Sequence, residues 1–129
     1  MSTLANRFKA LSEDVRLQIL ALIVQHGELC VCEVERFLEI SQSKASRHLR
    51  YLLNAGLLED HRDGLWVYYR VADPDSETDR QFLDGVRILL AGVPIPDVRD
   101  DLHEMRSERC GPASPAPAGK RATAAGMGA

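Results

Sequence analysis

Long apolar runs are missing from this sequence of 129 residues. No stretch approaches the ~18 consecutive apolar residues of a transmembrane helix, and the N-terminal segment MSTLANRFKA lacks the apolar core of a secretory signal. We therefore expect a cytoplasmic protein that has no membrane partner. With 45% hydrophobic and 27% charged residues, a chain of this length fits one domain with a single core.

Recognisable signatures of catalysis are missing as well. The sequence contains no phosphate-binding glycine loop, no nucleophile elbow and no paired carboxylates in a familiar setting. Cysteine, histidine and aspartate all occur, but no spacing among them selects a catalytic set. We expect neither enzymatic activity nor an organic cofactor.

An excess of charge of one sign is also absent, because the formal net charge is only −3. This balance neither requires nor excludes a nucleic-acid partner, since DNA responds to a local basic surface and not to the total charge. The distribution of charge along the chain must therefore decide.

Cysteine is scarce, with three in the sequence, and two of them stand one residue apart in the segment ELCVCE at positions 28–33. In a reducing compartment, an odd number of cysteines with two nearly adjacent favours a metal or redox role over a disulfide framework. Ordinary small core residues are the alternative interpretation.

Helical periodicity dominates the first part of the chain. Leu4, Phe8 and Leu11 have the spacing of a short amphipathic helix. Ser12 is the expected N-cap of a second helix, EDVRLQILALIVQH, which is apolar nearly all round and should end at Gly27. Such a helix belongs at the centre of the core.

Two further helices are expected in close succession. The first covers residues 31–39, and the second is the segment QSKASRHLRYLLN, capped by Ser41 and terminated by Gly56. The break EIS between them is three residues long. Two helices joined by so short a turn form a helix-turn-helix.

Strand periodicity follows, because residues 65–71 alternate in polarity and Asp63 with Gly64 favours a tight hairpin turn. A last helix is expected around residues 82–90, and the charged segment 97–109 should add a helical turn or two. The predicted fold class is mainly α (α+β): a winged helix-turn-helix with a two-stranded β-wing and terminal dimerisation helices.

The predicted domain covers residues 1–107 and combines DNA binding with dimerisation. Residues 108–129 are predicted to form a disordered C-terminal tail, since the segment from Cys110 onward is mostly alanine, proline and glycine with few large apolar groups.

The fourth helix has the composition of a DNA-reading helix. No acidic side chain occurs between positions 41 and 54, and its first turn is built from small hydrogen-bonding residues that suit base edges and phosphates. A wing with a basic residue near its tip follows, placed to enter a minor groove. A merely solvated polar face is the alternative. The predicted DNA contacts are Ser41, Gln42, Ser43, Lys44, Ser46, Arg47, Arg50 and Arg62.

A single winged helix grips only a few base pairs, so two copies across a palindrome are expected. The apolar stripe of the last helix has little left to cover inside so small a domain, and with two N-terminal residues it would bury well against a two-fold mate. The predicted homodimer interface consists of Leu4, Phe8, Phe82, Val86, Leu89 and Leu90.

Three segments in this order, ELCVCE, SQSKASRHLRYLLNAGLL and DGLWVYYRV, resemble the ArsR/SmtB family of metal-responsive winged-helix repressors. The resemblance extends from about Phe8 to Val71, and KALSEDVRLQIL fits it too. ELCVCE resembles the signature of the arsenite-responsive members, whose thiols bind trivalent arsenic or antimony. The resemblance implies a dimeric repressor on the palindromic operator of an arsenic-resistance operon, released by arsenite or antimonite as inducer.

The sequence departs from that signature at one position. The arsenite repressors that it resembles have a third cysteine in the pattern C-x-C-x-x-C, where this sequence has Glu35. A carboxylate is a hard ligand and a poor substitute for thiolate toward a soft ion. The implied ligands are therefore Cys30 and Cys32, with the third position open among Cys110 of either subunit, a small cellular thiol, or nothing.

The two thiols have a physical rationale of their own. Cys32 should lie in the first turn of the third helix, where the helix dipole lowers the pKa of a thiol. Cys30 lies just before it. In a continuous helix the two side chains would point about 200° apart, whereas in an extended segment they would share a side. In either case a bound ion would hold the start of the helix that supports the DNA-reading helix, so inducer and operator should oppose each other.

Alternatives remain within the same fold. A cadmium or lead sensor shares the C-x-C pattern but recruits cysteines from an N-terminal extension, and none precedes Cys30 here. A thiol redox sensor would oxidise Cys30 and Cys32, although a C-x-C disulfide closes a cramped ring. Zinc sensing through the last helix requires histidine, which residues 78–91 lack.

Overall fold

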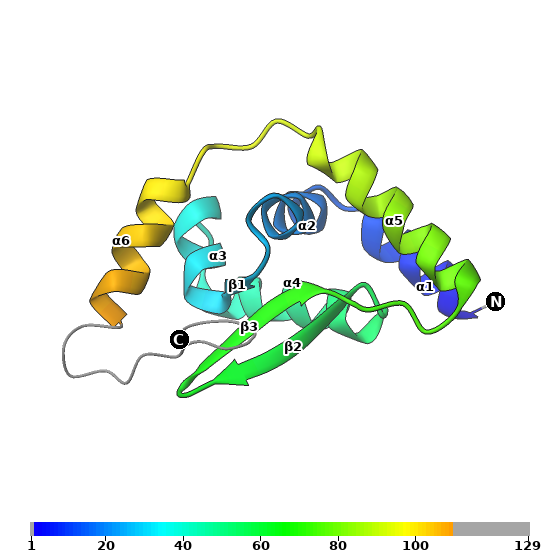
Figure 1. Cartoon of the computed structure of the whole chain (residues 1–129), viewed down its shortest axis with the longest axis horizontal. Helices are drawn as coiled ribbons and strands as arrows, with labels where there is room; N and C mark the ends of the chain where they lie inside the picture. The colour runs from blue at the N-terminus through cyan, green and yellow to red at the C-terminus, as the bar shows by residue number, and fades with distance from the viewer. Residues whose placement is uncertain (1, 110–129) are drawn as a thin grey trace.

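A computed structural model of the chain describes residues 2–109, which form six helices and three strands in the order α1-α2-β1-α3-α4-β2-β3-α5-α6 (Figure 1). The helices are α1 (Ser2–Leu11), α2 (Asp14–His26), α3 (Val31–Leu38), α4 (Gln42–Asn54), α5 (Glu77–Ala91) and α6 (Arg99–Arg109). The strands are β1 (Leu29–Cys30), β2 (Leu58–Asp63) and β3 (Trp66–Val71). The predicted winged helix-turn-helix class is confirmed.

Helix α2 is the centre of the core, as predicted. Five consecutive residues, Ile19–Ile23, are fully buried, because α1, α4, α5 and β3 surround the helix. Gly27 ends it with φ of +95°, a value in the left-handed region where a side chain would be strained.

The predicted N-cap of α2 is wrong by one residue. The carboxylate of Glu13 accepts the first-turn N–H of Arg16 at 2.8 Å, and this bond lowers the pKa of Glu13. Ser12 instead donates its hydroxyl to the carbonyl of Lys9 at 2.8 Å, at the end of α1. A carboxylate competes well with a hydroxyl for this position, because it also complements the helix dipole.

Helices α3 and α4 form the predicted helix-turn-helix. Helix α3 ends at Leu38, one residue earlier than predicted, because Glu39 adopts a left-handed conformation with φ of 55°. Ser41 caps α4 as predicted, since its hydroxyl accepts the N–H of Lys44 at 3.2 Å.

Arg7 holds the far end of α4 against α1 and α5. Its guanidinium donates to the carbonyls of Ala55 and Gly56 at 3.3 Å each and forms an ion pair with Asp79. The bond from Arg7 lowers the pKa of the Asp79 carboxyl. Gly56 has φ of +80°, and a Cβ there would lie 3.2 Å from Arg7 Nη2, so both the turn and the close approach favour glycine.

The wing has one strand more than predicted. Strands β2 and β3 pair as a hairpin whose two-residue turn is Gly64 and Leu65, but β1 adds to the other edge of β3, so the antiparallel order is β1-β3-β2. Cys30 lies opposite Tyr68 in this ladder. A two-residue strand is too short to leave a period in the sequence, and it attaches the cysteine segment directly to the wing.

The predicted dimer interface needs a correction at two positions. Val86 and Leu90 are only 6% exposed within one protomer, because this side of α5 covers α2. Leu89 is 74% exposed, and the neighbouring Ile88, which was not predicted, is 75% exposed. Leu4 and Phe8 are also exposed, and Phe8 contacts the partly exposed ring of Phe82 edge to face.

Helix α6 is longer than the predicted turn or two, with 11 residues reaching Arg109. Residues 108 and 109, assigned to the tail by composition, are therefore helical. The rest of the predicted tail, residues 110–129 with Cys110, lies outside the described residues. Within residues 2–109, no helix is both long and apolar enough to cross a membrane.

Replacing Leu22 by alanine should lower the free energy of unfolding by about 2–5 kcal/mol, because the fully buried side chain leaves a cavity against rigid neighbours. Urea denaturation of both proteins measures the difference. Gln18→Ala, on the exposed side of α2, is the matched control and should change stability by less than about 0.5 kcal/mol. Equal losses for the two variants would contradict the central position of this helix.

Candidate functional site

The two cysteines of ELCVCE lie side by side where β1 passes into α3. Cys30 has extended backbone, with φ of −97° and ψ of 171°, and is the N-cap residue of α3, while Cys32 lies in the first helical turn. Their Sγ atoms are 3.0 Å apart. Two sulfurs bonded to one ion at ~2.3 Å are at most ~4.6 Å apart. The helix thus does not continue through both cysteines: the chain enters in an extended form that ends at Cys30, and the two sulfurs are already within chelating distance.

The two thiols differ in access. Cys30 is 3% exposed, whereas Cys32 is partly exposed. Both sulfurs lie at the N-terminal end of α3, where the helix dipole is positive. An ion that bridges both sulfurs therefore approaches from the side of Cys32.

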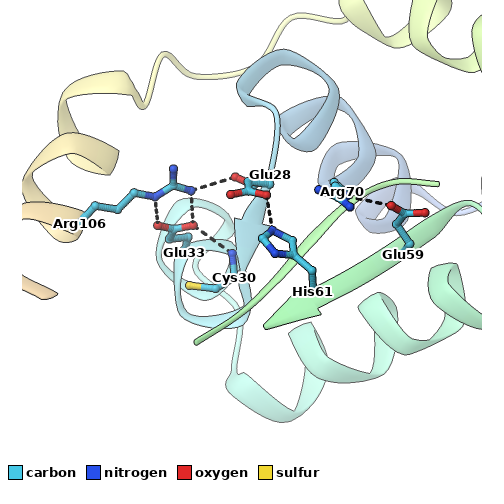
Figure 2. A network of polar contacts seen from close by, with 7 residues as sticks. All are labelled: Glu28, Cys30, Glu33, Glu59, His61, Arg70 and Arg106. Carbon is cyan, nitrogen blue, oxygen red and sulfur yellow. Dashed lines mark hydrogen bonds and ion pairs between the residues drawn. The ribbon is translucent and has the colours of Figure 1, made fainter. Parts of the chain in front are cut away.

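A buried carboxylate holds the start of α3 in place. Glu33 is fully buried, and its Oε1 accepts the N–H of Cys30 at 3.0 Å. Arg106 from α6 donates to both of its oxygens, from Nε at 2.8 Å and from Nη2 at 2.9 Å (Figure 2). Nη2 of Arg106 also donates to the carbonyl of Glu28 at 2.9 Å. A bidentate pair of this kind orients both partners as well as neutralising them.

Two aromatic side chains of the wing pack against the thiols. Tyr68 is fully buried and packs with Cys30, Cys32 and Trp66. The guanidinium of Arg106 lies 5.3 Å from the centre of the Tyr68 ring.

A contact with β2 completes the surroundings of the cysteine segment. His61 stacks on Tyr68 with ring centres 5.8 Å apart, and its Nε2 lies 2.7 Å from a carboxylate oxygen of Glu28 (Figure 2). The segment 28–33 is thus connected to the wing on one side and to α6 on the other.

Sequence reasoning missed Glu33, Arg106, Tyr68 and His61. The one local signal was the spacing Cys30-x-x-Glu33, which matches the Ser/Thr-x-x-Glu pattern of a helix N-terminus with cysteine in the cap position. Nothing in the sequence indicated the partner of Glu33, because Arg106 is 73 residues away.

The structure offers two sulfur donors at this site. Within residues 2–109, no group of three or more histidine, cysteine, aspartate or glutamate side chains is arranged to hold a metal ion. Glu35, at the position of the expected third cysteine, therefore does not complete a site with the pair, and the candidate third ligand Cys110 lies outside the described residues.

The predicted DNA surface has the expected exposure. On α4 the buried face consists of Ala45, Leu49 and Leu52. The predicted contacts are on the opposite side or at the N-terminus, and all are exposed except the partly exposed Ser46; they are Ser41, Gln42, Ser43, Lys44, Ser46, Arg47 and Arg50. Arg62 is exposed near the end of β2, one residue before the strand ends.

Four cations on these two elements are available to phosphates. Within residues 2–109, the side chains of Lys44, Arg47, Arg50 and Arg62 form no ion pair. His48, between them, is half-buried, and burial lowers its pKa, so it is neutral at pH 7. Exposed unpaired cations at a helix N-terminus and on a wing are the usual donors to a DNA backbone.

These elements define the chain as a winged helix-turn-helix protein with two neighbouring thiols at the start of the first helix of that motif. The family described as "Bacterial regulatory protein, arsR family" matches residues 13–60. The arsenic resistance transcriptional regulator ArsR1 of Pseudomonas putida is 55% identical over 79 residues, covering 61% of this chain and 62% of the relative. The chain thus matches less than two thirds of the length of the curated relatives compared first.

Solved structures agree with the family match. A homodimeric winged helix-turn-helix DNA-binding domain from Mycobacterium bovis, a possible ArsR-family regulator, is 32% identical with a TM-score of 0.56, covering 68% of this chain and 78% of that one. The antimony-specific transcriptional repressor AntR is 25% identical with a TM-score of 0.51, covering 67% and 76%. This chain belongs to the arsR family, a family of DNA-binding transcriptional regulators and not of enzymes.

Replacing Arg106 by alanine should lower the free energy of unfolding by about 3–5 kcal/mol, because it leaves the carboxylate of Glu33 buried without its cation. Arg99→Ala is the matched control on the same helix, since Arg99 pairs with Asp97 at the surface and its loss should have no measurable effect. Thermal and urea unfolding measure both variants. If Arg106→Ala were as stable as Arg99→Ala, the buried pair would not hold α6 in place.

Proposed function

We propose that this protein is a cytoplasmic, dimeric transcriptional repressor that binds a palindromic operator of an arsenic-resistance operon. It leaves the operator when trivalent arsenic or antimony binds Cys30 and Cys32. The observation that carries the proposal is the 3.0 Å separation of the two Sγ atoms at the N-terminus of the helix that precedes the recognition helix. The relative ArsR1 is an arsenic resistance transcriptional regulator and the neighbour AntR is an antimony-specific transcriptional repressor, which supports this choice of inducer.

The chemistry of the thiol pair suits these elements. Trivalent arsenic and antimony are soft, and thiolates are the softest ligands that a protein supplies. Each sulfur bond to arsenite forms as a hydroxide leaves with the thiol proton as water, so two cysteines release two water molecules and no electrons are transferred.

The position of the pair accounts for release from DNA. Helix α3 begins at the dithiol and packs against the recognition helix α4, while β1 pairs Cys30 with Tyr68 in the wing. An ion that binds both sulfurs redefines the cap of α3 and the end of β1 together, so it acts on both elements that contact DNA. Coupling of this kind between two sites is typically about 1–3 kcal/mol, or roughly 5–150-fold in affinity.

Dimerisation uses the outer surface of α1 and α5. Leu4, Phe8, Ile88 and Leu89 are large apolar side chains that remain exposed on these two helices, and α1 and α5 lie side by side at one end of the molecule (Figure 1). An apolar surface across two helices is typical of a subunit interface. The homodimeric neighbour from Mycobacterium bovis supports the assignment.

Fluorescence anisotropy of a labelled fragment from the promoter of the chain's own gene tests the repressor function. The protein should bind, and arsenite or antimonite should release it. Cys30→Ser and Cys32→Ser should bind the operator with affinity near that of the wild type but lose release, because a hydroxyl is a hard and weakly acidic substitute for a thiol. Arg50→Ala, on the exposed face of α4, should instead weaken operator binding without inducer.

Titration with cadmium and with peroxide distinguishes the arsenic-responsive repressor from a cadmium sensor and from a thiol redox sensor. Release by cadmium at concentrations where arsenite has no effect would identify a cadmium sensor, and release by peroxide alone would identify a thiol redox sensor. Normal release of either serine variant by arsenite would rule out the thiol pair as the inducer site.

Replacing Leu89 by aspartate should convert the dimer to a monomer at micromolar concentration, because it places a charge in the apolar interface. Light scattering measures the mass. Leu65→Asp is the matched control, since Leu65 is 91% exposed at the turn of the wing, and that variant should remain a dimer. A wild-type protein that is monomeric under these conditions would contradict the proposed interface.

A further inference from the structure

A depression of about 300 Å³ lies beside the exposed side of the thiol pair. Three elements line it: α3, α6 and β3. The two lining residues of α3 are four positions apart and the two of α6 are three positions apart, so each pair lies on one face of its helix. The volume is at the lower end of the range of small-molecule pockets. The lining consists of Cys32, Arg36, Trp66, Met105 and Glu108.

The lining carries one positive and one negative charge. Within residues 2–109, neither Arg36 nor Glu108 forms an ion pair. The indole of Trp66 and the thioether of Met105 provide apolar surface between α3 and α6. Two unlike charges that face one small depression without pairing to each other suit a ligand that has both a carboxylate and an ammonium group.

The valence of arsenic explains why such a ligand would bind there. Trivalent arsenic makes three bonds, and the described residues provide two sulfurs for them. Cys30 is buried, so the third bond of an ion held by the pair is directed toward the open side of Cys32, which is part of the depression.

We propose that a small zwitterionic thiol, of the class of cysteine or glutathione, completes the arsenic site from this depression. Its sulfur takes the third bond, its carboxylate binds the guanidinium of Arg36, and its ammonium binds Glu108 beside the indole of Trp66. The step is balanced: arsenite and three thiols form three arsenic–sulfur bonds and release three water molecules, with no change of oxidation state. The inference rests on the proposed function, because it requires arsenic on Cys30 and Cys32.

Arsenite titration of the full chain with different added thiols tests the inference. At equal thiol concentration, cysteine or glutathione should tighten arsenite binding at least about tenfold more than 2-mercaptoethanol, which has a thiol but no charges; tenfold corresponds to about 1.4 kcal/mol. Native mass spectrometry should detect the complex of protein, arsenic and thiol. The added thiol that forms this complex, cysteine or glutathione, is the one that the depression binds. Arg36→Gln and Glu108→Gln should lose the preference, and Arg80→Gln, an exposed arginine on α5, is the control.

Phenylarsenite separates failure of this inference from failure of the proposed function. It has one carbon substituent and therefore needs only two sulfurs, so it should bind wild type, Arg36→Gln and Glu108→Gln alike, with or without added thiol. If it does not bind the wild type, the dithiol is not an arsenic site.

Two results would contradict the binding of a zwitterionic thiol and leave the proposed repressor function intact. One is binding of phenylarsenite together with an equal effect of 2-mercaptoethanol and cysteine. The other is tight arsenite binding without any added thiol that is lost in Cys110→Ser, which would assign the third bond to Cys110.

Discussion

The buried carboxylate of Glu33 is the charge on which the arrangement of this site depends. A carboxylate without solvent is costly unless it is paired and hydrogen-bonded, and here the N–H of Cys30 and the guanidinium of Arg106 satisfy it. The same three hydrogen bonds set the first turn of α3 and the position of α6. A residue that binds no ligand therefore determines where the thiols lie and what covers them.

Short paths of contacts connect the thiol site to the predicted DNA surface. The site shares β1 with the sheet of the wing and shares α3 with the helix-turn-helix. His61 reaches Glu28 from β2, and Arg70 and Glu59 join β2 to β3 through an ion pair at 2.8 Å (Figure 2). The two elements predicted to contact DNA, α4 and the wing, each pack against an element that begins or ends at the dithiol, so under the proposed function a small change at Cys30 or Cys32 need not travel far to alter their relative position.

Much of the architecture was predictable because it follows from local rules. The helix over residues 14–26 followed from an apolar run ended by Gly27, and the cap of α4 followed from Ser41 before a helical pattern. The exposed basic face of α4 was predictable for the same reason, since buried Ala45, Leu49 and Leu52 recur at helical spacing. Such features depend on neighbours within a few residues.

Positions that depend on distant partners were predicted poorly. Val86 and Leu90 were assigned to a dimer interface, because an apolar stripe does not reveal whether it packs inside the protomer or against a partner subunit. In the structure α2 covers both residues and leaves Ile88 and Leu89 exposed. Strand β1 escaped notice because it exists only through its pairing with β3.

The sequence by itself determined the helix-turn-helix, the wing hairpin, the exposed cations of α4 and the dithiol at a helix start, because periodicity, capping and residue spacing are encoded locally. Only the tertiary structure decided that the chain reaches the cysteine pair as a strand joined to the wing, and that Arg106 pairs with the buried Glu33. It also decided that α3, α6 and Trp66 of β3 line an open depression beside Cys32. These features join parts of the chain that are tens of residues apart, and packing of the whole chain is what selects such contacts.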